Sequence, residues 1–467
     1  STGFDGGVFI ASCDKSVPAC LMGLGRLDMP SIVVTGGVMD AGPDLLTLEQ
    51  IGAYSAMCQR GEITEEKLTY YKHHACPSCG ACSFMGTAST MQVTAEALGL
   101  MLPGSALMPA TCGDLKEMAY KAGVQVMELA RKGIKASDIV TMKSFENAIM
   151  VHAAISGSTN SLLHIPAIAH EFGLEIDGDT FDRMHRGAHY LLDIRPAGKW
   201  PAQFFYYAGG VPAVMEEIKS MLHLDVMTVT GKTLGENREE LKNNGFYDKC
   251  EGYLKQWGLK RTDVIRTFDQ PIGTDGTVAI LRGNLAPEGA VVKHSAVPKE
   301  MFQAVLRARP FNCEEDAIEA VISKRIKPGD AVFIRYEGPK GSGMPEMFYT
   351  TEAISSDPEL GKTIALITDG RFSGASKGPA IGHVSPEAAQ GGPIALVEED
   401  DLIRIDIPAR VLEIIGVKGE ELPKEEIGRI LAERKKAWKP MPPKYTKGVL
   451  KIFSEHAVSP MKGGYMV

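Results

Sequence analysis

Cysteine, aspartate and lysine stand together directly after a short apolar run near the start of the sequence. The run Val8-Phe9-Ile10 predicts a buried strand, and Ser12-Cys13-Asp14-Lys15 follows it. Ligands bind at the carboxyl ends of strands in open α/β sheets. A soft thiolate suits iron and a hard carboxylate suits magnesium, so this position is a candidate metal site. The competing interpretation is a buried cysteine followed by an ordinary turn.

A second cluster has three cysteines at three-residue spacing, Cys76, Cys79 and Cys82, ahead of residues 87–100, which have helical periodicity. Such a run can ligate an iron–sulfur cluster, hold zinc or form a redox pair. Inert buried cysteines seldom repeat at a fixed spacing. The pattern therefore favours a metal or redox site over a structural role and leaves its kind open.

Three further segments combine glycine with polar residues. Ser158, Thr159 and Asn160 precede a predicted helix at 161–171, where backbone N–H groups suit a carboxylate or hydroxyl, so we expect these three residues to bind substrate. The alternative is a simple helix cap. Glu346 and Ser373 lie in glycine-containing segments that each follow a predicted strand. The alternative for Glu346 is a solvated charge in a loop, and the alternative for Ser373 is an ordinary turn residue.

The order of apolar segments predicts an α/β protein with two domains. Strands alternate with helices in the first part, which favours a domain with a largely parallel sheet over residues 1–265. Short strands between Gly/Pro turns dominate residues 266–467, which favours a β-barrel-like domain ending in a charged helix at 423–438 and a tail. The boundary is expected between about 255 and 275.

The composition excludes several functional classes. The 467 residues carry a net charge of −8, which provides no basic field for nucleic acid. No apolar stretch reaches the roughly 18 residues of a membrane span. Nine cysteines, several of them clustered, and no signal peptide favour a cytoplasmic protein with metal chemistry. We expect its partner to be a small acidic substrate, which a local cation or metal must attract.

The motifs together resemble the dihydroxy-acid and sugar-acid (phosphogluconate) dehydratase family. Cys13-Asp14-Lys15, with Pro18-Ala19 and Gly36-Gly37, resembles its opening motif, and residues 80–91 with Glu96-Ala97-Leu98-Gly99 resemble its second. The resemblance runs in order from about Phe4 to Arg410. The other matching segments are Gly157-Ser158-Thr159-Asn160, Asp193-Ile194-Arg195-Pro196, Ala208-Gly209-Gly210-Val211-Pro212, and residues 338–347, 368–374 and 382–388.

This resemblance implies a hydro-lyase that removes water from a 2,3-dihydroxy carboxylic acid. It also implies an α/β domain joined to a β-barrel-like domain. By resemblance, Cys13 and Cys82 ligate an iron–sulfur cluster, either [2Fe–2S] or [4Fe–4S]. Asp14 and Glu346 would hold Mg²⁺ together with Lys15 as its carbamate, which is chemically a carboxylate.

Ser373 resembles the catalytic base of the family, so Ser373 and Lys15 are the expected catalytic residues. Two features depart from the family pattern. Its third cluster cysteine and a further magnesium-binding aspartate belong to an N-terminal segment that this sequence does not contain. In addition, Cys79 stands where relatives often carry another residue. Similar family members are dimers or tetramers, so we expect a homodimer or homotetramer.

The aromatic segment at 198–207 bears on the choice of substrate. This segment resembles the sugar-acid branch of the family more than the amino-acid biosynthetic branch. The resemblance implies that the substrate is an aldonate such as a pentonate, which is converted to a 2-oxo-3-deoxy acid. The alternative is a dihydroxy-acid dehydratase of branched-chain amino-acid biosynthesis, which needs an apolar pocket. Core packing of the aromatic residues is the competing explanation. A non-catalytic iron–sulfur or zinc-binding protein is the alternative from another functional class.

Overall fold

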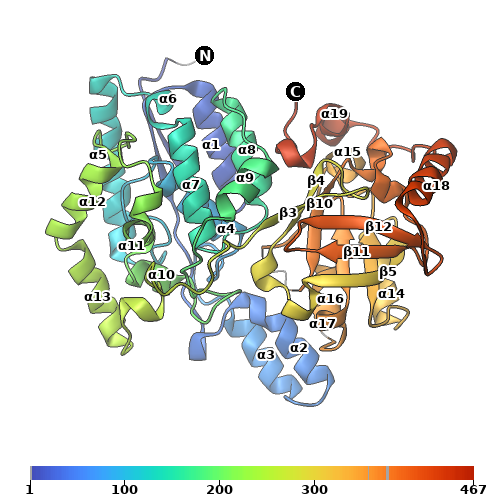
Figure 1. Cartoon of the computed structure of the whole chain (residues 1–467). Helices are drawn as coiled ribbons and strands as arrows, with labels where there is room; N and C mark the ends of the chain where they lie inside the picture. The colour runs from blue at the N-terminus through green and yellow to red at the C-terminus, as the bar shows by residue number, and fades with distance from the viewer. Residues whose placement is uncertain (1–2, 356, 375–377) are drawn as a thin grey trace. The chain divides into compact units, whose positions relative to one another are not determined.

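The chain divides into two units, which the computed structural model describes for residues 3–355, 357–374 and 378–467 (Figure 1). Two short segments, residues 55–60 and 177–182, belong to unit 2 although the sequence on either side of each belongs to unit 1. Unit 1 comprises residues 1–54, 61–176 and 183–277. Unit 2 comprises residues 55–60, 177–182 and 278–467.

Unit 1 is mainly helical, with one small parallel sheet. Strands β1 (Gly7–Ala11) and β2 (Ser31–Thr35) pair in register from Gly7 with Ser31 to Ala11 with Thr35. Helix α1 (Ser16–Leu27) packs on β1, and α5 (Gly113–Lys132) packs on β2. The prediction of an α/β fold is confirmed, but that of a largely parallel sheet in the first domain is wrong, because the described residues of unit 1 form a sheet of only these two strands.

Helix-on-helix packing takes the place of the expected sheet. Helix α4 (Thr87–Ala97) is buried along its whole length and packs against α7 (Met142–Ala154), while α1 packs against α8 (Ser161–Glu171). A helix buried on all sides needs partners around its full circumference. The other helices that begin in unit 1 are α2 (Ile51–Gln59), α3 (Glu65–His74), α6 (Ala136–Ile139), α10 (Gln203–Tyr207), α11 (Gly210–Glu217), α12 (Leu234–Asn243) and α13 (Phe246–Gln256). Helix α9 (Gly178–His185) begins in unit 2 and ends in unit 1.

Unit 2 is built on a mixed nine-stranded sheet in the order β13-β12-β11-β5-β6-β8-β10-β4-β3. The four central strands β5, β6, β8 and β10 are parallel, and the strands on either side of them are antiparallel. A bridge between Arg282, which follows β3, and Val411 of β12 links the two ends of the sheet. The sheet is therefore curved, as the barrel-like prediction requires.

The bounds of these elements are as follows. The strands of the sheet are β3 (Ala279–Leu281), β4 (Gly289–Val292), β5 (Gln303–Phe311), β6 (Asp330–Ile334), β8 (Ala365–Thr368), β10 (Ala380–Ser385), β11 (Leu402–Asp406), β12 (Val411–Val417) and β13 (Glu420–Glu421). A separate pair consists of β7 (Glu346–Met347) and β9 (Arg371–Phe372). The helices are α14 (Glu314–Ile322), α15 (Pro339–Ser342), α16 (Tyr349–Ser355), α17 (Leu360–Thr363), α18 (Lys424–Ala437) and α19 (Gly448–His456).

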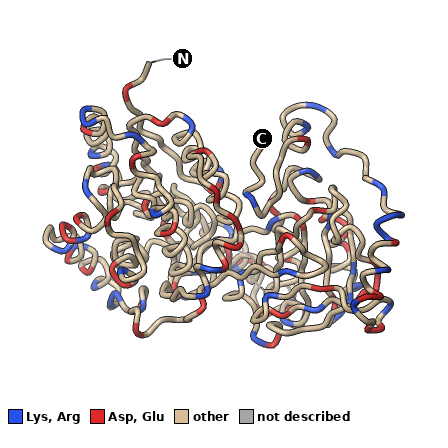
Figure 2. Tube along the Cα trace, turned by 45° about the horizontal axis from the view of Figure 1, so that its top comes forward, with Lys and Arg blue, Asp and Glu red and all other residues tan. Residues whose placement is uncertain are grey.

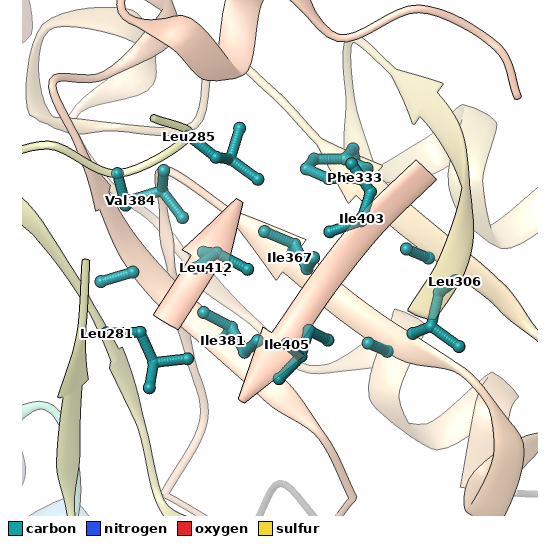
Figure 3. Close-up of a cluster of buried hydrophobic side chains, with 14 of the residues drawn as sticks. Leu281, Leu285, Leu306, Phe333, Ile367, Ile381, Val384, Ile403, Ile405 and Leu412 are labelled. Atoms are coloured by element: carbon teal, nitrogen blue, oxygen red, sulfur yellow. The ribbon is translucent and has the colours of Figure 1, made fainter. Parts of the chain in front are cut away.

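The central strands are apolar on both faces because both faces of the sheet are covered. Phe333 and Ile367 belong to one buried cluster, whose side chains converge from strands across the sheet (Figure 3). Their neighbours Val332 and Leu366 belong to a second cluster on the opposite face, with side chains of α14 and α16. The two-residue period of a strand explains this alternation. Continuous apolar runs such as Ala331–Ile334 are typical of parallel strands covered on both sides.

Charged residues of both signs are interspersed along the described parts of both units (Figure 2). Neither sign dominates one unit in this view. No helix in the described part of the chain has the length and apolar character that crossing a membrane requires.

Candidate active site

The loop that leaves β1 carries the first group of predicted site residues. Cys13 donates its backbone N–H to Ser16 Oγ at 3.0 Å, and its carbonyl accepts the N–H of Val17 at 3.1 Å, which starts α1. Asp14 is half-buried and forms an ion pair with Lys15. The strand end and the first turn of α1 therefore bring a thiol, a carboxylate and an amine together.

The loop that carries Cys82 is bonded to the segment that follows β2. Ala81 donates its N–H to Gly37 O at 3.0 Å, and Met39 donates its N–H to Ala81 O at 2.8 Å. Since β1 and β2 are parallel neighbours, this pairing brings the Cys82 loop to the end of the sheet from which Cys13 emerges. Glycine is required at Gly37, where φ is +69° and a Cβ would lie 2.0 Å from Met108 O.

Gln92 joins the two strand exits, a role that none of the sequence motifs predicted. Its side chain is fully buried on α4, and its Nε2 donates to Ser12 O at 2.9 Å and to Gly37 O at 3.1 Å. These carbonyls follow β1 and β2, respectively. A glutamine on a helix composed mostly of small and apolar residues was the sequence signal for this role.

The thiol of Cys82 lies close enough to those of Cys13 and Cys76 for their charges to interact. Burial, together with the charges of the neighbouring Cys13, Cys76 and Asp14, raises the pKa of Cys82 to about 11. A thiolate at this position therefore needs a compensating cation. Cys79 is exposed, and its carbonyl accepts a bond from Ser78 Oγ at 3.1 Å. Within the described ranges, however, no three His, Cys, Asp or Glu side chains converge as a metal-holding group.

The predicted substrate residues form a tight turn before α8. Ser158 and Asn160 are buried, and Thr87 Oγ1 lies 2.8 Å from Ser158 Oγ and accepts a bond from Asn160 Nδ2 at 2.8 Å. Ser158 donates its N–H to Thr90 Oγ1 at 3.0 Å. The side chains of Ser158 and Asn160 thus hold the turn together, while Thr159 is half-buried.

Two buried histidines support the same turn. His152 Nε2 lies 3.0 Å from Ser158 O, and His152 Nδ1 lies 3.2 Å from His185 Nε2. His185 Nδ1 accepts the N–H of Thr277 at 3.3 Å. Because a carbonyl only accepts and a backbone N–H only donates, each imidazole must carry its proton on Nε2. The turn at Ser158 is therefore anchored by two neutral imidazoles in one fixed tautomer.

In unit 2, the structure brings Glu346 and Ser373 to one place. Strands β7 and β9 are parallel, with Glu346 opposite Arg371, and Ser373 donates its N–H to Met347 O at 3.0 Å. Both Glu346 and Ser373 are half-buried. The pairing of β7 with β9 therefore places the carboxylate of Glu346 and the hydroxyl of Ser373 on neighbouring segments.

The other glutamate of this segment has an internal role. Glu337 is 4% exposed, accepts a hydrogen bond from the Ser342 hydroxyl, and lies 3.8 Å from the ammonium of Lys444. Burial raises the pKa of Glu337. Of the two glutamates, Glu346 is the more accessible and is the candidate for ligand binding.

The aromatic segment at 198–207 belongs to the core of unit 1. Phe204, Phe205 and Tyr206 are at most 2% exposed, and the ring centroid of Phe204 lies 5.2 Å from that of Trp257. The Tyr206 hydroxyl donates to Asp114 at 3.0 Å. The interpretation of this segment as evidence for a sugar-acid pocket is therefore not supported, because its buried rings pack against other aromatic residues.

Comparison with known proteins identifies the family. The N-terminal model of the dihydroxy-acid/6-phosphogluconate dehydratases matches residues 1–237, and the C-terminal model matches residues 263–464. The chain belongs to this family. It is accordingly a hydro-lyase, as the motifs predicted, acting on a small acidic substrate.

Relatives within the family match almost the whole chain. The dihydroxy-acid dehydratase of Acetivibrio thermocellus is 46% identical, over 99% of this chain and 80% of the relative. That of Caldanaerobacter subterraneus is 45% identical, over 99% of this chain and 79% of the relative. That of Methanosarcina barkeri is 44% identical, over 99% of this chain and 80% of the relative. All three carry the dihydroxy-acid name, whereas the segment at 198–207 was interpreted as favouring the sugar-acid branch.

Proposed function

We propose that this chain is a dihydroxy-acid dehydratase, which converts a branched-chain 2,3-dihydroxy acid to the 2-oxo acid. This function was the alternative at the sequence level. The observation that carries it is the 44–46% identity, over nearly the whole chain, to proteins named dihydroxy-acid dehydratase. The burial of residues 204–206 supports it as well, because their rings are not available to line a pocket for extra hydroxyls.

We propose Cys13 and Cys82 as ligands of an iron–sulfur cluster. Thiolates are the usual ligands of such clusters. Cys13 raises the pKa of Cys82, which supports the assignment because a cationic cluster core would favour both thiolates. Bound iron with an open coordination position would supply a Lewis acid for the departing 3-hydroxyl.

We propose Asp14, Glu346 and a carbamylated Lys15 as ligands of Mg²⁺. Without carbamylation, the ammonium of Lys15 neutralises Asp14 through their ion pair. Carbamylation replaces that positive charge by a carboxylate, so two adjacent anions would then need a divalent cation. Bound Mg²⁺ would stabilise the negative charge that develops when the C2 proton leaves.

We propose Ser373 as the base that takes the C2 proton. An isolated serine hydroxyl is too weakly acidic to form a base near neutral pH, so this role requires a nearby cation to lower its pKa. The bond from Ser373 N–H to Met347 O holds the serine at the end of β9. In the turn at 158–160, the accessible Thr159 would contact substrate, while Ser158 and Asn160 shape the turn. We further propose a homodimer or homotetramer, which light scattering would test.

The first experiment is anaerobic purification followed by iron and sulfide assays and an absorption spectrum. Formation of 2-oxo acid is then measured from 2,3-dihydroxyisovalerate, pentonates and hexonates. A brown protein that prefers 2,3-dihydroxyisovalerate supports the proposal. A preference for a pentonate would overturn the substrate assignment, and a colourless protein with stoichiometric zinc would overturn the cluster assignment.

Variants then test the residue roles. Ser373→Ala should abolish turnover without removing iron, whereas Ser454→Ala, a half-buried serine of α19 bonded to Leu450 O, should behave as wild type. Cys82→Ser should remove the cluster absorption, whereas Cys20→Ala, a half-buried cysteine of α1, should retain it. Unchanged activity of Ser373→Ala would exclude that residue as the base.

A further inference from the structure

Three strand-exit loops of unit 2 meet at the buried carboxylate of Asp369. Strands β6, β8 and β10 are parallel neighbours, so their carboxyl ends lie at one edge of the sheet. Asp369 directly follows β8 and is 0% exposed. Its Oδ1 accepts the N–H of Glu337 at 3.0 Å. Its Oδ2 accepts the N–H of Tyr336 at 3.1 Å, after β6, and that of Ala388 at 2.7 Å, after β10.

The loops after β6 and β8 are joined again further along. Residues 336–347 end in β7, residues 369–373 contain β9, and these two short strands pair with each other. Arg371 Nε also donates to Met344 O at 2.9 Å. The two loops are thus tied at their base by Asp369 and at their tip by β7 and β9. Glu346 and Ser373 lie at that tip.

The bonds at the base depend on a carboxylate. Asp369 accepts three backbone N–H groups, and an ionised carboxylate has enough lone pairs for all of them. An amide would offer one oxygen and turn its own NH₂ group toward an N–H donor. Glu387 extends the arrangement, since it is 0% exposed and accepts the N–H groups of Lys340 and Gly341, each at 3.0 Å. Burial raises the pKa of Asp369 to about 6, while its N–H donors oppose that rise.

We propose that Asp369 is a positioning residue, whose carboxylate holds the loop of Ser373 against the loop of Glu346. Its consequence for catalysis rests on the proposed function of those two residues. Misplacement of a reacting group by about 1 Å can cost about 100-fold in rate. Loosening the base of the two loops should therefore lower kcat and leave KM within about threefold.

The test compares Asp369→Asn with Asp330→Asn. Asp330 is 2% exposed and lies at the opposite end of β6, where it accepts the N–H of Lys327 at 2.8 Å and pairs with Arg309. Both variants remove one buried charge from unit 2. Backbone hydrogen exchange is followed by mass spectrometry over residues 336–347 and 368–374, alongside steady-state kinetics. Asp369→Asn should speed exchange in both loops by about tenfold, the equivalent of about one lost hydrogen bond. Asp330→Asn should leave exchange in both loops unchanged.

Exchange in the wild-type protein provides a test that needs no variant to fold. The amides of Tyr336, Glu337 and Ala388 should exchange more slowly than their loop neighbours. Equal exchange rates there, or loops unaffected by Asp369→Asn, would overturn the proposal. Faster exchange with wild-type kcat would overturn the positioning role. Failure of wild-type protein to dehydrate any dihydroxy acid would instead overturn the proposed function, and the exchange comparison would still decide whether Asp369 holds the loops.

Discussion

Substitution of Gly80 should release the Cys82 loop from the sheet. Gly80 has φ of +116°, and an added Cβ would lie 2.4 Å from both the amide nitrogen of Met39 and the carbonyl carbon of Val38. Both are backbone atoms next to the bonds that hold Ala81. A flexible side chain could swing away from such a contact, but a backbone cannot. Gly80→Ala therefore forces the two segments apart.

The free-energy cost of Gly80→Ala is the sum of the lost hydrogen bonds and the backbone strain. The two hydrogen bonds made by Ala81, to Gly37 O and from Met39 N, contribute roughly 0.5–1.5 kcal/mol each. A non-glycine residue in this backbone region costs on the order of 1–3 kcal/mol. The sum is about 2–6 kcal/mol, or a factor of roughly 30 to 10⁴ in the local opening equilibrium. Because opening the loop costs less than unfolding unit 1, the variant should stay folded.

The assay is alkylation of Cys82 in the metal-free protein, measured peptide by peptide, together with the iron content after anaerobic reconstitution. Gly80→Ala should label faster at Cys82 and bind less iron. Gly61→Ala is a control for backbone strain alone, because Gly61 has φ of +76° but no heavy atom within 4 Å of an added Cβ. Gly123→Ala, inside α5 with open space around it, controls for the substitution itself. Wild-type labelling and iron content in Gly80→Ala would refute the argument.

Three further predictions concern stability. Burial raises the pKa of Glu96 to about 7, so its contribution to stability is complete below pH 4.5 and is lost as pH rises through about 7. The free energy of unfolding of the wild type should therefore fall between pH 5 and pH 8 by up to about 3 kcal/mol more than that of Glu96→Gln. Denaturant unfolding of both proteins at the two pH values measures this difference. Arg410→Met breaks a 2.8 Å pair with Asp182 between side chains 8% and 13% exposed, and should cost about 3–5 kcal/mol. An unchanged melting temperature would contradict that estimate. Phe333→Ala should cost about 3–5 kcal/mol in the core of unit 2, while Val305→Ala, 54% exposed on β5, should cost little in the same thermal melt.

Local patterns in the sequence predicted many of the elements that carry the site. The apolar run Val8-Phe9-Ile10 lies in β1, and the helical periodicity at 161–171 is α8. The predicted helix at 423–438 is α18, but the tail after it contains another helix, α19. The motifs also identified the family and its reaction class, because they keep residue types and order that the family's chemistry needs. The roles of individual site residues stay predictions.

The substrate interpretation shows where sequence patterns fail. The aromatic run around Phe204 had two explanations, a polar pocket and a packed core, and the sequence contains nothing that separates them. The burial of Phe204 decides for the core, and its ring partner Trp257 lies some fifty residues away in the chain. A local pattern shows that a side chain seeks burial, but not against which partner.

The same limit explains what only the tertiary structure decided. Nothing next to Gln92 in the sequence indicates that its amide joins the exits of β1 and β2. Nothing next to Asp369 indicates that its carboxylate collects N–H groups from loops after β6 and β10. The sequence by itself determines the residue types and their local periodicity. The partners of buried polar groups depend on strand order, and strand order is set by contacts between segments far apart in the chain.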